Sequence, residues 1–401
     1  MAHQPNEPHP AISDGVYLNL PEEDYFGQDC LGSTDLIRLH QRKWGWWWSS
    51  RYNPERQQTP QDYFTYGSAL HSILLEGVGA YEARFAAAPD KEAFDKLAVT
   101  IEDMQAAIRE GGFALSGTSA WKAKDWRLAM RANLPGHPCW PNIVEDFEDS
   151  IGERRAIRGV DDRMLRLMRE VAIDPARPDN DDIRKLFDDD HPPLAEVSIF
   201  WTEGGVRRRA RIDRMFPAFD MDLKSLGNWS GRPLPWVTGE QIAKGGYDIQ
   251  RADYWIARAK AMEFIREGQL FGGSIEQRKW LQTWPDEHQD WDWVWLFYQK
   301  PEPSGRAPVI FPVMDVTRIQ TTPGEFRLSE VLEVGLLKRQ GALQFYRSTV
   351  AEFGLDRPWA RVETLHYTDE AYTPRVFLPP WISETEPTIP GAYDGDDEHE
   401  R

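Results

Sequence analysis

Apolar residues recur with two different periods along this chain, and the change of period divides it into helical and extended segments. In residues 163–173 the apolar positions Met164, Leu165 and Met168 follow one another at helical spacing. Three strands are predicted after this helix, over residues 195–201, 206–216 and 219–224, with Glu203-Gly204-Gly205 as the turn between the first two.

The rest of the pattern predicts helices flanking these strands. Ser33-Thr34-Asp35 is typical of the N-terminal cap of a short helix. Residues 90–190 are polar and mainly helical, which indicates a helical insertion. Further helices are expected over residues 66–76, 241–267 and 328–353, and further strands over residues 291–298 and 309–316. The chain is therefore expected to have an α/β fold with a mixed central β-sheet flanked by helices.

Composition limits the classes of protein that remain. The chain has 401 residues, of which 41% are hydrophobic, enough to bury a substantial core. Its two cysteines, Cys30 and Cys139, exclude a disulfide framework and four-cysteine zinc or iron–sulfur sites. We expect a cytoplasmic protein without a membrane segment, because the N-terminus is polar and no apolar run approaches about 18 residues.

The formal net charge of −18 argues against a general affinity for nucleic acid. The charge is unevenly distributed, however, because residues 384–401 alone hold seven acids and one arginine. We expect residues 1–14 to be a flexible N-terminus, residues 356–383 a C-terminal extension and residues 384–401 an acidic disordered tail.

The residues with the clearest potential for chemistry lie on the second and third predicted strands. Asp222 and Lys224 are two residues apart, so their side chains leave the same face of a strand. A hairpin connection can bring Asp213 beside Asp222, and two carboxylates form a site suited to Mg²⁺ or Mn²⁺. A lysine there can orient a water molecule or offset charge on a phosphate. The alternative is an ordinary charged surface strand.

A following helix could present polar groups to the same site. Gln250 and Tyr254 are one helical turn apart, and Tyr247 and Arg258 extend their face. An amide, a phenol and a guanidinium on one face could contact a phosphate. The alternative is an amphipathic helix whose tyrosines are buried in the core.

The order of these residues resembles the motif set of the PD-(D/E)XK nucleases, and within them the exodeoxyribonuclease VIII (RecE-like) exonucleases of phages and prophages. The resemblance rests on His71, Glu196, Asp213, Asp222-Leu223-Lys224 and Gln250-x-x-x-Tyr254, with Gly67-Ser68-Ala69-Leu70 and Gly246-Tyr247 around them. It covers about residues 15–355, except that residues 100–160 match nothing in the family. Ile212 and Ser225 stand where the family usually has proline and threonine.

The resemblance implies a restriction-endonuclease-like core and a role for each matching residue. Asp213, Asp222 and the carbonyl of Leu223 would bind Mg²⁺ or Mn²⁺, with His71 as a further metal ligand. Lys224 would be catalytic, and Glu196 would assist metal binding or water placement. Gln250, Tyr254 and Tyr247 would position the DNA backbone. From the residues alone, His71 could equally be a packed core residue and Glu196 a strand-edge acid.

The implied activity is Mg²⁺-dependent exonucleolytic digestion of linear duplex DNA for phage-type recombination. The family also implies a homo-oligomeric ring and a single-strand annealing recombinase as partner. A structure-specific or single-strand DNA endonuclease is one alternative. A catalytically inactive module that binds DNA ends or a partner is another.

Two further groups of residues have both a functional and a structural interpretation. Arg207, Arg209 and Arg211 alternate on the same strand face as Asp213 and could track phosphates, or could form a solvated face paired with acids. The tryptophans at positions 46–48, 291, 293 and 295 could stack on unpaired bases. We expect instead that they fill the core, because aromatic residues at a period of two are ordinary sheet packing.

Overall fold

The computed structural model describes residues 11–56, 62–187, 193–228, 231–284, 290–299 and 309–360, with the backbone alone for residues 62–65. The predicted acidic tail, residues 384–401, lies outside the described residues, as does most of the predicted extension over residues 356–383. None of the described helices is long and apolar enough to cross a membrane.

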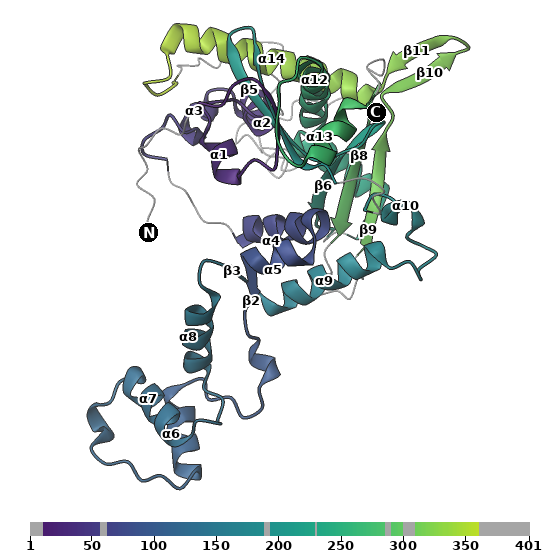
Figure 1. Ribbon diagram of the computed structural model, residues 1–401. Coiled ribbons are helices and arrows are strands. Elements are labelled where there is room, and N and C mark those ends of the chain that lie inside the picture. Colours follow the sequence, from purple (N-terminus) through teal and green to yellow (C-terminus); the bar gives the residue numbers. More distant parts are fainter. Residues whose placement is uncertain are drawn as a thin grey trace, which may run out of the picture.

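A mixed sheet of seven strands forms the centre of the described part of the chain, as predicted (Figure 1). Its order is β7-β1-β4-β5-β6-β8-β9, and the pairs β7–β1 and β6–β8 are parallel while the other pairs are antiparallel. The strands are β1 (Gly15–Leu18), β4 (Ala195–Glu203), β5 (Val206–Met215), β6 (Phe219–Leu226), β7 (Leu270–Gly272), β8 (Asp292–Gln299) and β9 (Val309–Asp315). The α/β class with flanking helices is therefore confirmed.

Strand β8 explains why the sheet is covered on both faces. Its sequence is almost continuously apolar, which is typical of a strand buried on two sides. Trp293 and Trp295 point into one core cluster, whereas Val294 and Leu296 belong to the cluster on the opposite face. The interpretation of Trp293 and Trp295 as core residues is confirmed, since each is 1% exposed.

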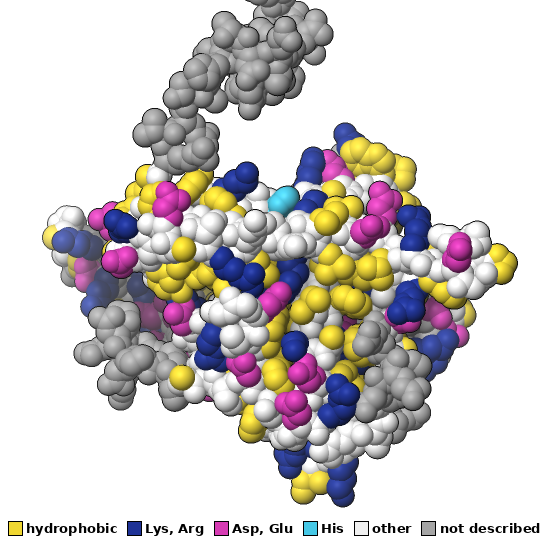
Figure 2. Space-filling model, turned by 90° about the horizontal axis from the view of Figure 1, so that it is seen from above, with side chains coloured by type: hydrophobic (Ala, Val, Ile, Leu, Met, Phe, Trp, Pro, Cys, Tyr) yellow, Lys and Arg dark blue, Asp and Glu magenta, His cyan; other side chains and the backbone are white. Residues whose placement is uncertain are grey.

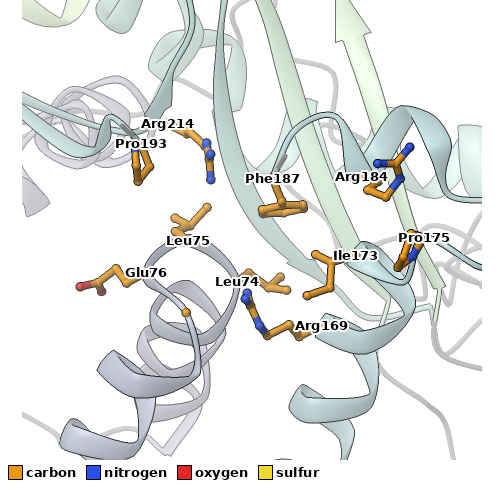
Figure 3. Close-up of a pocket in the computed structure, with 11 residues that line it drawn as sticks. Leu74, Leu75, Glu76, Arg169, Ile173, Pro175, Arg184, Phe187, Pro193 and Arg214 are labelled. Atoms are coloured by element: carbon orange, nitrogen blue, oxygen red, sulfur yellow. The ribbon is translucent and has the colours of Figure 1, made fainter. Parts of the chain in front are cut away.

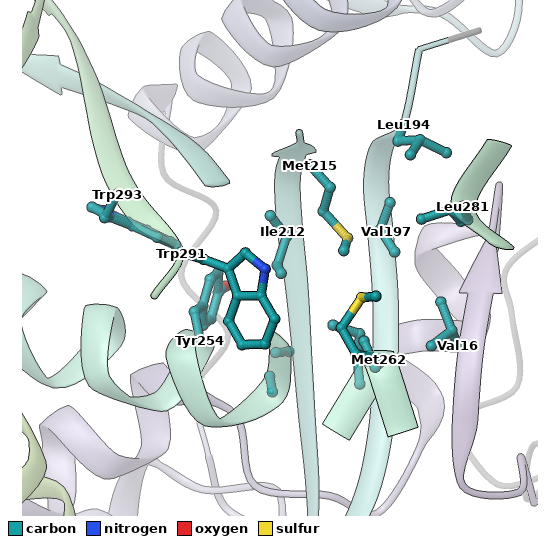
Figure 4. Close-up of a cluster of buried hydrophobic side chains, with 14 of the residues drawn as sticks. Val16, Leu194, Val197, Ile212, Met215, Tyr254, Met262, Leu281, Trp291 and Trp293 are labelled. Carbon is teal, nitrogen blue, oxygen red and sulfur yellow. The ribbon is translucent and has the colours of Figure 1, made fainter. Parts of the chain in front are cut away.

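Helix α12 (Tyr247–Arg266) covers the first face. Tyr254 and Met262 of this helix pack against Ile212, Trp291 and neighbouring strand residues (Figure 4). The second face is covered by α4 (Asp62–His71), the π-helical turn η1 (Ser72–Glu76) and α9 (Gly159–Ile173). Helix α14 (Glu330–Phe353) packs outside α12 and against α2 (Ser33–Arg42).

The helical insertion has its own apolar cluster. Helices α6 (Ile101–Glu110) and α7 (Ala123–Asn133) pack around residues such as Met104 and Trp126, and α8 (Trp140–Ile151) contacts α7. They project away from the sheet (Figure 1) and are joined to it through the paired strands β2 (Phe85–Ala87) and β3 (Arg155–Ile157). Helix α9, although it lies within residues 90–190, packs on the central sheet.

The remaining elements are short. They are α1 (Glu22–Gly27), α3 (Gly45–Ser49), α5 (Val78–Arg84), α10 (Asp181–Arg184), α13 (Ile275–Gln282), the 3-10 turns η2 (Lys91–Ala93) and η3 (Thr118–Ala120), and the hairpin β10 (Arg318–Thr322) and β11 (Glu325–Leu328).

The predicted helix over residues 241–267 is wrong in one respect, because two helices occupy this region. Helix α11 (Leu234–Gly245) ends at Gly246, which has a left-handed φ of 69°, and α12 begins at the next residue. A β-carbon at Gly246 would lie 2.8 Å from Cγ2 of Ile37. Glycine is therefore required here both by backbone conformation and by the close approach of α2.

We expect Gly246→Ala to lower the free energy of unfolding by about 1–3 kcal/mol, because it adds both left-handed strain and a steric contact. Gly239→Ala is the matched control, since Gly239 lies inside α11 with open space around its Cα. That substitution should stabilise the protein by up to about 1 kcal/mol. Urea unfolding monitored by circular dichroism measures both changes, and equal effects would contradict the assignment of the helix break.

Candidate metal and catalytic site

Three side chains that can ligate a metal converge where α4 meets the sheet. His71 ends α4, Glu196 lies in β4 and Asp213 lies in β5. One ligand atom from each lies within 4.8 Å of the other two. The His71 Nδ1 atom is 3.3 Å from Oε1 of Glu196, and its Nε2 atom is 3.6 Å from Oδ2 of Asp213. The imidazole therefore bridges the two carboxylates.

The backbone is irregular at Glu196 and directly after His71. Glu196 has a φ of 53° within a strand, between the regular pairs Ala195↔Arg214 and Val197↔Ile212. A left-handed backbone at a residue other than glycine costs about 1–3 kcal/mol and is concentrated at functional sites. On the opposite side of the site, the α-helix that carries His71 changes to π-helical geometry at the next residue, which is also frequent at functional sites.

Asp213 is positioned by the separation of two strands. Strand β5 pairs with β6 only at Arg214↔Met221 and Met215↔Asp220, next to the turn that joins them. Beyond these pairs, Oδ2 of Asp213 accepts a hydrogen bond from the backbone N–H of Leu223 at 2.7 Å. The Asp213 carboxylate thus takes the place of a backbone carbonyl as the hydrogen-bond acceptor for β6. This contact fixes the carboxylate at the point where the two strands separate.

Asp222 and Lys224 form a second group beside this one. The Nζ atom of Lys224 is 2.5 Å from Oδ2 of Asp222. Gln250 of α12 donates from Nε2 to Oδ1 of the same carboxylate at 2.9 Å. Lys224 also lies over the ring of Tyr247, 5.1 Å from its centroid. Asp222 is 1% exposed, so its orientation is fixed by these neighbours.

Electrostatic coupling within the site is strong. Burial is the largest influence on Asp213 and, with the charges of Asp222 and Glu196, raises its pKa to about 7. Burial opposes the charge on His71, but the charges of Asp213 and Glu196 outweigh it and raise the pKa of His71 to about 9. Burial also opposes the charge on Lys224, but the charges of Asp222 and Asp213 outweigh it and raise the pKa of Lys224. Lys224 is consequently charged at neutral pH.

The three side chains could hold a metal ion. Carboxylates and imidazole are both ligand types that bind divalent cations in proteins. The raised pKa of Asp213 shows that its negative charge is poorly compensated where it is buried, and a bound cation would compensate it.

The structure brings together most of the predicted site residues, in roles that partly differ from those expected. His71, Glu196 and Asp213 make one cluster, whereas Asp222 lies outside it and is held by Lys224 and Gln250. Leu223 contributes a backbone N–H to Asp213. Gln250 is 8% exposed and orients Asp222, and its expected contact with the DNA backbone stays a prediction.

The two tyrosines of α12 that were expected to position the DNA backbone have different surroundings from each other. Tyr254 is 7% exposed and packs edge-on against Trp293, which agrees with the alternative that it belongs to the core. Tyr247 is half-buried, and its hydroxyl accepts a hydrogen bond from Nε2 of Gln241 at 3.3 Å.

The arginines predicted to form a row on β5 contact the N-terminal segment of the chain. Arg209 donates from Nη1 to the carbonyl of Tyr25 at 2.8 Å, and Arg207 and Arg211 donate to the carbonyls of Ile12 and Leu20. These guanidinium groups hold the N-terminal segment against β5, because that segment runs along the strand and presents backbone carbonyls to it. Their expected role as a phosphate track stays a prediction.

One contact of this row reaches the metal cluster and was missed by sequence reasoning. The Nε atom of Arg211 is 3.6 Å from Oε2 of Glu196 and donates to Oγ of Ser198 at 2.9 Å. The signal was present in the alternation of the strand, which places Arg211 and Asp213 on one face, but the partner on β4 could not be identified without the register.

Comparisons with known proteins find a distant structural likeness. No protein-family model matches the chain, and no curated protein matches it. A crystal structure of a "Putative exonuclease" from Eubacterium rectale is similar over 87% of this chain and 96% of that chain, with a TM-score of 0.36 and 11% sequence identity. A likeness at this level carries no argument about function.

We expect Mn²⁺ to raise the melting temperature of the protein relative to EDTA, by about 2–5 °C at saturation. The increase should grow from pH 6 to pH 9, because protons on Asp213 and His71, with pKa values of about 7 and 9, compete with the cation. Differential scanning fluorimetry across this pH range measures the effect. Asp213→Asn should abolish it, and an undiminished shift in that variant would rule out the proposed ligand set.

Proposed function

We propose that this protein is a Mg²⁺-dependent deoxyribonuclease that hydrolyses phosphodiester bonds of DNA. The observation that carries the proposal is the position of the His71, Glu196 and Asp213 cluster beside the ion pair of Asp222 and Lys224. Phosphodiester hydrolysis needs a metal, a positioned water molecule and a cation near the developing charge. His71, Glu196 and Asp213 could supply ligands for the metal, and Lys224 is a candidate for the cation near the developing charge.

The metal would be held by His71, Glu196 and Asp213, with Mn²⁺ as a possible replacement for Mg²⁺. Such a cation, when bound, polarises a phosphoryl oxygen and lowers the pKa of a coordinated water molecule. Asp222, which sequence reasoning assigned to the metal, is close enough to raise the pKa of Asp213. In the structure its carboxylate is directed to Lys224 and Gln250, so we assign it the positioning of Lys224.

Lys224 would stabilise negative charge rather than accept a proton. Its raised pKa keeps the ammonium group charged at neutral pH, which suits a group that stabilises the negative charge of a five-coordinate phosphoryl transition state. Asp222 and the ring of Tyr247 hold the ammonium in place from two sides. Gln250 of α12 in turn fixes Asp222. Helix α12 therefore sets the position of the Lys224 ammonium indirectly, through Gln250 and Asp222.

The finer part of the proposal concerns the substrate. Following the RecE-like resemblance, we propose exonucleolytic digestion of linear duplex DNA by a homo-oligomeric ring that supplies single strands to an annealing recombinase. Basic and acidic side chains are interspersed on the face shown in Figure 2. A chain of net charge −18 would gain from enclosing its substrate, because bulk electrostatic attraction does not retain DNA.

Lys224→Ala should lower the rate of DNA cleavage in Mg²⁺ by about 10²-fold or more, because it removes charge stabilisation at the phosphate. Lys244→Ala is the matched control, since Lys244 is 76% exposed on α11 and forms a surface ion pair. Cleavage of an end-labelled duplex gives the rates, and the Mn²⁺-induced rise in melting temperature checks that the site remains folded. Equal activity of both variants would reject a catalytic role for Lys224, and full wild-type activity in excess EDTA would reject a metal-dependent nuclease.

An exonuclease should digest linear duplex DNA and leave a closed-circular duplex of the same sequence intact, because it needs a free end. Light scattering under the same conditions should give the mass of an oligomer. A nicked circle controls for access at an interior break. A monomer that cuts closed circles as fast as linear DNA would favour the endonuclease alternative, and a protein that binds ends without cutting in Mg²⁺ or Mn²⁺ would favour the inactive binding module.

A further inference from the structure

The direction of the Glu196 carboxylate is not set by regular strand geometry. Val197 packs in the apolar cluster on one face of the sheet, whereas Ala195 packs against the cluster on the other face. In a regular strand these side chains, two positions apart, would lie on the same face. Strand β4 therefore reverses its faces at Glu196, whose backbone is left-handed. The contacts of the Glu196 side chain are what fix its direction.

Two basic side chains hold this carboxylate, one at each oxygen. Nδ1 of His71 lies 3.3 Å from Oε1, and Nε of Arg211 lies 3.6 Å from Oε2. A hydroxyl group adds a second link between Arg211 and Glu196. Oγ of Ser198 accepts a hydrogen bond from Nε of Arg211 at 2.9 Å and donates one to the backbone carbonyl of Glu196 at 3.4 Å. Arg211 thus contacts the side chain of Glu196 directly and its backbone through one hydroxyl.

Arg211 is itself fixed by the N-terminal segment. Its Nη2 atom donates to the carbonyl of Leu20 at 2.6 Å, and its guanidinium lies over the ring of Tyr25, 4.4 Å from the centroid. The Arg211 side chain is 12% exposed. These contacts use the planar fork of donors and the flat face of a guanidinium, which the single ammonium of a lysine does not reproduce.

Other arginines of β5 have different surroundings. Arg214 lies near the end of the strand and lines a cavity of about 460 Å³ together with Phe187 (Figure 3). Arg209 anchors the same N-terminal segment as Arg211, because its guanidinium donates to the carbonyl of Tyr25 at 2.8 Å. Arg209 therefore shares one role with Arg211, the anchoring of this segment, and is a matched control for the other.

We propose that Arg211 is a positioning residue that holds the Glu196 carboxylate in the metal cluster, so that the N-terminal segment over residues 20–25 supports the site through it. The inference rests on the metal cluster of the proposed function. Loss of a group that orients a ligating carboxylate from outside the coordination sphere typically lowers metal affinity about 10–100-fold. Arg211 also places a positive charge near the cation, so its charge and its geometry act on metal binding in opposite directions.

Arg211→Lys separates geometry from charge, because it keeps the positive charge and removes the planar fork. We expect Mn²⁺ to bind this variant about 10-fold more weakly than the wild type, as measured by isothermal titration calorimetry at constant pH. The Mn²⁺ concentration for half-maximal cleavage of duplex DNA should rise by the same factor, with KM for DNA unchanged. The melting temperature in EDTA shows whether the variant is folded.

Two further variants serve as controls. Arg209→Lys makes the same substitution in the same strand, at a side chain that anchors the N-terminal segment, and it should keep the wild-type affinity for Mn²⁺. Ser198→Ala keeps Arg211 and removes only the hydroxyl link. It should weaken Mn²⁺ binding about 3-fold, which corresponds to the loss of one neutral hydrogen bond.

Each outcome decides the role of Arg211. Equal loss of Mn²⁺ affinity in Arg211→Lys and Arg209→Lys would assign the effect to anchoring of the segment and overturn the inference. Unchanged or tighter Mn²⁺ binding by Arg211→Lys would also overturn it, and a raised KM for DNA in that variant would assign Arg211 to the substrate. If Arg211→Lys does not fold, an undiminished affinity in Ser198→Ala would reject the positioning role.

Failure of the inference differs from failure of the proposed function. If the wild type and Arg211→Lys bind Mn²⁺ equally and the wild type cleaves DNA, Arg211 does not position Glu196 and the nuclease proposal stands. If Arg211→Lys binds Mn²⁺ more weakly but the wild type does not cleave DNA, the nuclease function fails and the positioning role stands. A wild type that binds no Mn²⁺ would overturn both.

Discussion

The site depends on the early separation of β5 from β6. Regular pairing stops after Arg214↔Met221, and the Asp213 carboxylate accepts the N–H of Leu223 that a ladder carbonyl would otherwise take. A buried backbone donor left unsatisfied would cost about 1–3 kcal/mol, so the carboxylate has a structural duty as well as a chemical one. The same oxygen lies 3.6 Å from Nε2 of His71. The separation of the two strands therefore also places Asp213 in the metal cluster.

Packed helices on both faces of the sheet hold the site in position. Helix α12 covers one face, and α4, η1 and α9 cover the other. Each element contributes one part of the site: α4 gives His71, and α12 gives Gln250, which orients Asp222. Residues on packed helices and strands keep their positions more precisely than residues on loops do. This explains how residues 179 positions apart in the sequence, such as His71 and Gln250, can serve one site.

Sequence reasoning recovered the features that local patterns determine. The strands around Asp213 and Asp222 follow from alternation and from the turn at Glu203-Gly204-Gly205, and β8 follows from its apolar run. The break at Gly246 was missed because apolar periodicity continues through it, while the requirement for glycine comes from Ile37 on another helix. The left-handed backbone of Glu196 has no signal in its own sequence, since it depends on what lies across the sheet. The contacts of the arginine row could not be predicted for the same reason, because its acceptors are carbonyls of a distant segment.

Other arginines, buried in ion pairs, show why net charge is a poor guide to binding in this chain. Arg208 is fully buried and donates to both oxygens of Asp253 at 2.7 Å, and Arg339 joins the same carboxylate at 2.9 Å. Arg258 is likewise buried against Asp220. Charges committed to the fold in this way contribute little to the field at the surface, since paired ions largely cancel each other. Local geometry therefore decides where an anion can bind.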